Sequence, residues 1–151
     1  MTTMIDIAEF HTHQEYPNVS GVIFPDGRIC FINVSSDEAS GSFFKVDPTG
    51  ETTLEELEKK SNLCWSDGAI LAEQISNDGT LKVVCGEGDY GSDGFVAVVC
   101  LKTQKTLWIA ASNTSNPFDS VELHEGCVCA KSTLGYIWRF PLNNPCQFTV
   151  E

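Results

Sequence analysis

The sequence has few basic residues: 9 Lys and Arg stand against 21 Asp and Glu, so the formal net charge is -12. This scarcity argues against direct binding of nucleic acid, because affinity for phosphate backbones comes mainly from Lys and Arg. No apolar run approaches the ~20 residues of a membrane-spanning helix. The N-terminus also lacks a basic start followed by a long apolar stretch. We therefore expect no signal peptide, no membrane contact and a cytoplasmic location.

Catalytic motifs are also scarce. The sequence has no G-x-S-x-G elbow and no cysteine in an evidently basic setting, so neither common nucleophile pattern is present. In an extended segment, His11, His13 and Glu15 would project from one face, as some zinc and iron sites require. An enzyme would need these residues to converge, and His124 in a turn is the remaining histidine. A surface segment is the simpler interpretation, so we expect no enzyme, no catalytic residue and no cofactor.

The seven cysteines do not resemble a disulfide framework, because their number is odd and most lie in apolar, strand-like runs. Reduced core thiols in a cytosolic protein are the simpler expectation. Structural zinc sites use C-x2-4-C pairs. The closest pair here, Cys127 and Cys129, is separated by a single residue, and no second pair follows. We therefore expect no metal site.

What the chain does contain is typical of one β-rich domain spanning residues 1–151. Of the 151 residues, 42% are hydrophobic and 10% aromatic, which is enough for a packed core. An acidic residue followed by Gly recurs between apolar runs, and such dipeptides favour tight turns. Five of these dipeptides are Asp26-Gly27, Asp67-Gly68, Asp78-Gly79, Asp93-Gly94 and Glu125-Gly126. The pattern predicts an all-β fold, an antiparallel meander of hairpins arranged as propeller-like blades or as a β-sandwich.

One helix interrupts this pattern, near residues 53–60. Thr53 and Glu56 have the spacing of a capping box. Leu54 and Leu57 fall on one helical face, and lysines follow at the C-terminal end, where the helix dipole favours cations. The spacing therefore predicts one short amphipathic helix.

Residues 93–142 read as strands joined by short turns. Three features match a repeat unit: the strand start Gly94-Phe95-Val96-Ala97, the turn Lys102–Lys105 leading into Leu107-Trp108, and the closing Gly135-Tyr136-Ile137-Trp138. This part of the chain resembles a blade of a β-propeller of the quinoprotein-like or tryptophan-aspartate repeat type. The resemblance covers the last third of the chain and implies a fold only, because propeller function depends on loops particular to each protein.

The segment from Gly86 to Gly91 matches the string G-x-G-x-x-G after a strand-like run. A dinucleotide site would need a helix next, and here a second strand follows. The loop also carries Glu87, Asp89 and Asp93, which would repel phosphate. Three interpretations remain open for residues 86–94: a solvated hairpin loop, an acidic contact loop for a protein partner, or a calcium site built from these carboxylates.

The charge is the strongest functional clue, and the acidic excess is larger in residues 1–76 than in 77–151. It could serve solubility alone. Alternatively, clustered carboxylates can steer the protein toward a basic partner and can meet a Lys/Arg groove that normally holds phosphate. The candidate partner-binding residues are Asp37, Glu38, Glu87, Asp89, Tyr90 and Asp93.

In its size, acidity and lack of a catalytic constellation, the chain is similar to bacterial immunity proteins that neutralise delivered toxins. This resemblance implies a cytosolic protein that occludes the active site of a basic partner, most plausibly a nuclease toxin domain. The alternative is a propeller-like scaffold or adaptor domain that binds a peptide, a protein or a glycan, with acidity serving solubility.

Overall fold

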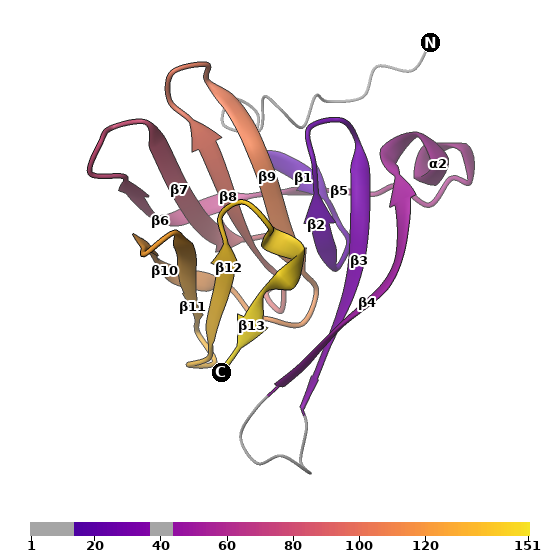
Figure 1. Ribbon diagram of the computed structural model, residues 1–151. Coiled ribbons are helices and arrows are strands. Elements are labelled where there is room, and N and C mark those ends of the chain that lie inside the picture. The colour runs from indigo at the N-terminus through magenta and orange to yellow at the C-terminus, as the bar shows by residue number, and fades with distance from the viewer. Residues whose placement is uncertain (1–13, 37–43) are drawn as a thin grey trace.

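The computed structural model describes residues 14–36 and 44–151 (Figure 1). The fold is all-β, as the turn pattern predicts. Over the described residues, the strands form antiparallel sheets of seven, four and two strands, accompanied by one short α-helix. No helix among the described residues is long and apolar enough to cross a membrane.

The seven-stranded sheet is the centre of the fold. Strand β8, next to the central strand β9, is buried along nearly its whole length, because other elements cover both faces of the sheet there. The strands in spatial order are β4 (Phe44–Thr53), β3 (Arg28–Ser36), β2 (Gly21–Ile23), β9 (Lys105–Ser112), β8 (Gly94–Cys100), β7 (Leu81–Glu87) and β6 (Ala69–Ile75).

The four-stranded sheet packs on one face of this large sheet, so the arrangement is a two-layered sandwich (Figure 1). Its strands are β10 (Phe118–His124), β11 (Cys127–Ser132), β12 (Ile137–Pro141) and β13 (Thr149–Val150), with the 3-10 turn η3 (Pro145–Gln147) before the last. The segment that resembles a propeller blade is divided between the layers: β8 and β9 belong to the large sheet, and β10 to β12 to the small one.

The opposite face of the large sheet carries a second, smaller core. The strands β1 (Glu15–Pro17) and β5 (Trp65–Asp67) pair with each other, and Tyr16 and Trp65 pack into this core. The helix α2 (Leu54–Lys59) contributes the buried Leu54. Both faces of the sheet are therefore shielded from solvent near its centre.

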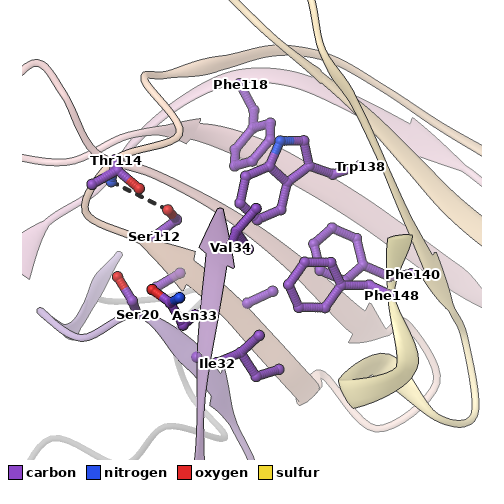
Figure 2. Close-up of a pocket in the computed structure, with 13 residues that line it drawn as sticks. Ser20, Ile32, Asn33, Val34, Ser112, Thr114, Phe118, Trp138, Phe140 and Phe148 are labelled. Atoms are coloured by element: carbon purple, nitrogen blue, oxygen red, sulfur yellow. Dashed lines mark hydrogen bonds between the residues drawn. The ribbon is translucent and has the colours of Figure 1, made fainter. Parts of the chain in front are cut away.

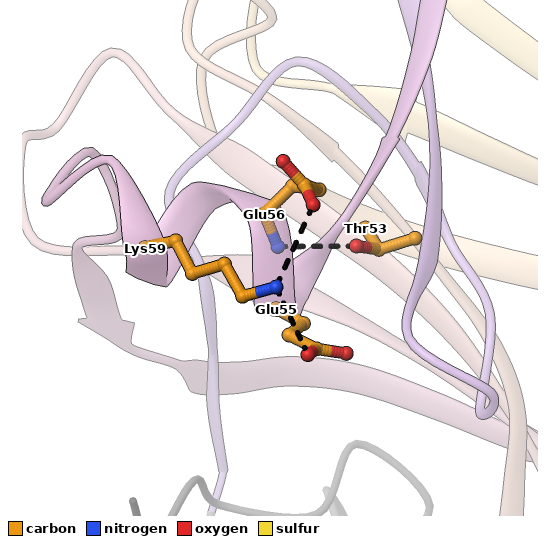
Figure 3. Close-up of polar contacts among 4 residues, drawn as sticks. All are labelled: Thr53, Glu55, Glu56 and Lys59. Carbon is orange, nitrogen blue, oxygen red and sulfur yellow. Dashed lines mark hydrogen bonds and ion pairs between the residues drawn. The ribbon is translucent and has the colours of Figure 1, made fainter.

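The helix begins where the capping box predicts (Figure 3). The Oγ1 atom of Thr53 accepts a hydrogen bond from the backbone N–H of Glu56 at 3.1 Å. The Nζ atom of Lys59 lies 3.3 Å from a carboxylate oxygen of Glu55 and 3.9 Å from one of Glu56. These ion pairs are exposed and add little stability, so the cap and the burial of Leu54 position the helix.

Three of the five acidic-glycine pairs named in the sequence analysis close hairpins. Gly27, Gly79 and Gly126 each have a positive φ angle, between 75° and 92°, which a Cβ atom would make costly. The other two glycines serve close packing instead. A Cβ at Gly68 would come within 3.0 Å of the Phe95 ring, and one at Gly94 within 2.9 Å of the Phe118 ring.

The tryptophans pack as the strand pattern predicts, but the expectation of core thiols holds only for Cys30, Cys85 and Cys129, and Cys64 is exposed. Trp108 and Trp138 are buried between the sheets, and Trp65 is partly buried in the smaller core. All seven cysteines are free thiols. The Cys85 thiol is fully buried and donates to the backbone oxygen of Phe118 at 3.3 Å.

Candidate functional site

Carboxylates gather at the end of the large sheet where β6 and β8 begin. In the pairing of β1 with β5, Glu15 lies directly opposite Asp67, and in the pairing of β6 with β7, Glu87 lies opposite Ala69. The loop of residues 88–93 follows at once and contributes Asp89. We call the residues Glu15, Asp67, Glu87, Asp89 and Tyr90 the acidic end.

The loop of residues 88–93 is held from inside by Asp93. This side chain is 2% exposed, and its Oδ1 atom accepts a hydrogen bond from the backbone N–H of Tyr90 at 3.2 Å. A second bond, from the backbone N–H of Asn116 to the oxygen of Ser92 at 2.9 Å, ties the loop to the connection between β9 and β10. The loop is therefore a fixed platform rather than a loose hairpin tip.

The Tyr16 side chain packs beneath the loop of residues 88–93. Its ring is 1% exposed and packs on Phe95 with centroids 5.1 Å apart, while its hydroxyl lies against the Asp93 carboxylate and the Ser66 hydroxyl. Burial raises the pKa of the Tyr16 phenol, and the charges of Asp93 and Asp89 raise this pKa further. Gly88 passes so close that a Cβ there would collide with both the Tyr16 hydroxyl and the Asp93 carboxylate.

Asp89 ties the loop to β5 and also contributes its charge to the surface. Its Oδ2 atom accepts a hydrogen bond from the backbone N–H of Asp67 at 3.2 Å. The next side chain, Tyr90, is 69% exposed although its backbone is anchored to Asp93. An aromatic ring on a fixed backbone loses little conformational entropy on binding, and such rings are frequent anchors at interfaces.

The carboxylates of the acidic end have no cationic partner among the described residues, whereas acidic residues elsewhere do. Lys82 lies 3.0 Å from Glu73 and Arg139 forms an ion pair with Glu151, for example. Like charges directly opposite each other on paired strands, as Glu15 and Asp67 are, destabilise a sheet. The pairing of Glu15 with Asp67 therefore lowers the stability of the free protein.

The structure separates the six residues expected to contact a partner. Glu87, Asp89 and Tyr90 come together at the acidic end. Asp93 departs from the expectation, because its buried carboxylate holds the loop and offers no surface to a partner. Asp37 and Glu38 lie outside the described residues.

The other candidate residues do not form a site that can be described. His11 and His13 lie outside the described residues, and His124 is exposed at the turn between β10 and β11, 3.8 Å from Glu125. Across residues 14–36 and 44–151, no group of three or more His, Cys, Asp or Glu side chains is placed to hold a metal ion. The calcium interpretation of the loop loses a ligand, since the Asp93 carboxylate points inward.

The sequence suggested Glu15 only as a metal ligand beside His11 and His13, and it did not suggest Asp67 or Tyr16 as part of a site. Asp67 was interpreted only as part of a turn, and Tyr16 has no local motif. The position of Asp67 was nevertheless a signal, because it ends the short strand that begins with Trp65. Glu87 ends β7 in the same way.

Comparison of the chain with protein-family models gives no match, and a search of curated proteins gives none either.

Proposed function

We propose that this protein is a small cytosolic binding protein that neutralises a basic protein partner. In the most specific form of the proposal it is an immunity protein that inhibits a nuclease toxin by covering its active site. The observation that carries the proposal is the acidic end itself: carboxylates from three strands and one loop, without a cationic partner among the described residues, lie at the same end of the fold as the exposed Tyr90.

The chemistry of a nuclease active site favours this match. A groove that binds a phosphate backbone is lined by Lys and Arg. Glu87 and Asp89 would pair with such side chains, and Tyr90 would insert between them as an anchor. Rim charges mainly set the association rate, by 10- to 1000-fold in favourable cases, while a few buried contacts set the dissociation rate.

The direct test is inhibition of a basic nuclease domain encoded next to the gene for this protein. We expect the purified protein to form a one-to-one complex with that domain and to suppress its cleavage of DNA or RNA. Full nuclease activity in the presence of excess protein, with no complex in size-exclusion chromatography, would overturn the proposal. Such a result would favour the alternative, a scaffold domain whose acidity serves solubility.

A further inference from the structure

A cavity of about 150 Å³ lies between the two sheets, and no residue of the acidic end lines it (Figure 2). Its wall on the small-sheet side consists of four aromatic rings: Phe118, Trp138, Phe140 and Phe148. The rings of Trp138 and Phe148 are stacked, with centroids 5.3 Å apart and planes at 13°. Phe118 meets Trp138 edge to face at 5.4 Å. The rings support one another, so this wall is already in place before any ligand binds.

The facing wall is formed by smaller side chains of the large sheet. Ala110 lies directly opposite Val22 on β2 and Val96 on β8, and its short side chain leaves space in front of the aromatic wall. Ile32 and Val34 of β3 close the adjoining side. A volume of about 150 Å³ is large enough for a single benzene ring.

The cavity also has a polar side. Ser20, Asn33, Ser112 and Thr114 lie across from the rings, and Figure 2 shows them gathered on one side. The Ser112 hydroxyl, 6% exposed, accepts the backbone N–H of Thr114 at 3.2 Å, and the Ser20 hydroxyl accepts that of Asn113 at 3.0 Å. No described residue accepts the proton of either hydroxyl. Because a hydroxyl both donates and accepts, each can still donate one hydrogen bond.

The charge of the lining residues indicates which class of ligand the cavity can bind. None of the described residues that line the cavity is charged. An ionised ligand would lose its hydration without gaining a counter-ion, which is costly in an apolar site. We propose that this cavity binds a neutral single-ring aromatic compound that carries one hydrogen-bond acceptor, with the ring against Trp138 and Phe148 and the acceptor on the hydroxyls of Ser112 and Ser20. This site is independent of the proposed binding of a basic protein.

The test uses benzamide as the probe, with benzoate and toluene as comparison compounds, and measures binding to the full chain by calorimetry and ligand-observed NMR. We expect benzamide to bind at least about tenfold more tightly than benzoate, because benzoate is charged. In the Ser112→Ala variant, benzamide should bind about fivefold more weakly, the effect of one hydrogen bond, while toluene binding is unchanged.

Two variants that fill the cavity locate the site. Ala110→Leu and Val34→Phe each place extra carbon atoms in the space that the ring would occupy, so both should abolish benzamide binding. Ala72→Leu is the matched control, because Ala72 contacts the same core but does not line this cavity. Circular dichroism shows which variants fold. Loss of benzamide binding in either folded variant, Ala110→Leu or Val34→Phe, is enough to locate the site. Absence of benzamide binding to the wild-type chain at about 10 mM benzamide would overturn the proposal. Equal binding by the wild type and a folded filled variant would overturn it too.

Discussion

The buried hydroxyl of Tyr16 lies against the buried carboxylate of Asp93, and this contact joins strand β1 to the loop that carries the exposed Tyr90. The acidic end is thus fixed by a phenol beneath it. The contact gives the surface loop a rigidity that a loop of its composition would not have alone.

Replacing Tyr16 by Phe should destabilise the fold by about 2 kcal/mol, because the Asp93 carboxylate loses a hydrogen-bonding neighbour in a buried site. Urea unfolding followed by fluorescence measures this difference. Tyr90→Phe is the matched control: Tyr90 is exposed in the same loop, so its loss of a hydroxyl should change stability by less than about 0.5 kcal/mol. Equal effects of the two substitutions would show that the Tyr16 hydroxyl does not support the loop.

The same contact predicts a pH dependence of stability. The pKa of Tyr16 is raised from its ordinary value of 10.0, so above pH 10 the unfolded chain releases the phenol proton while the folded chain keeps it. The contribution of the protonated Tyr16 phenol to the free energy of unfolding is present in full below pH 10. Above pH 10 it falls by about 1.4 kcal/mol per pH unit. We expect the free energy of unfolding of the wild type to fall more steeply between pH 10 and 11 than that of Tyr16→Phe. Parallel curves would contradict the assignment.

The contribution of the helix cap to the free energy of unfolding should be measurable with a single substitution. Thr53→Ala removes the side-chain acceptor for the Glu56 N–H and should lower the free energy of unfolding by about 1 kcal/mol. Thr49 lies exposed in the same strand β4 without a capping role, so Thr49→Ala should cost only a few tenths of a kcal/mol. A smaller loss for Thr53→Ala than for Thr49→Ala would mean that packing of Leu54 alone positions the helix.

Cysteine reactivity should differ sharply along the chain. Burial, together with the charge of Asp119, raises the pKa of Cys85 to about 12, so this thiol should resist alkylation in the folded protein. Hydrogen bonds from Thr103 lower the pKa of Cys100, at the end of β8. Mass spectrometry after brief treatment with iodoacetamide should therefore find Cys100 modified and Cys85 intact. Slower alkylation of Cys100 in Thr103→Ala is the corresponding check, and modification of Cys85 before unfolding would contradict its burial.

Local features of the fold could be predicted from the sequence, because their causes are local. The helix follows from the capping box at Thr53, and three hairpins follow from glycines that adopt positive φ angles. The pairing of β2 with β9 could not be predicted in the same way. It joins strands far apart in the chain, and nothing in either short apolar run specifies the other.

Those residues of the candidate site that are close together in the sequence could also be predicted. Glu87, Asp89 and Tyr90 stand within four consecutive residues, so their proximity was evident from the sequence. The burial of Asp93 depends on Tyr16, which belongs to a distant strand, and the sequence alone suggested another exposed acid. Glu15 joins the site for the same reason, because only the pairing of β1 with β5 brings it opposite Asp67.

The association rate between this protein and its basic partner tests the central claim most directly. The double variant Asp67→Lys and Glu87→Lys reverses charge at the acidic end and leaves Asp89 in place to hold the loop. Glu122→Lys with Glu125→Lys makes the same change of net charge at exposed positions on β10 and at its turn. At about 50 mM salt, stopped-flow fluorescence should show association slowed at least about tenfold in the first variant and much less in the second, with the difference shrinking by about 500 mM. Equal rates for the two variants, or rates insensitive to salt, would contradict the account.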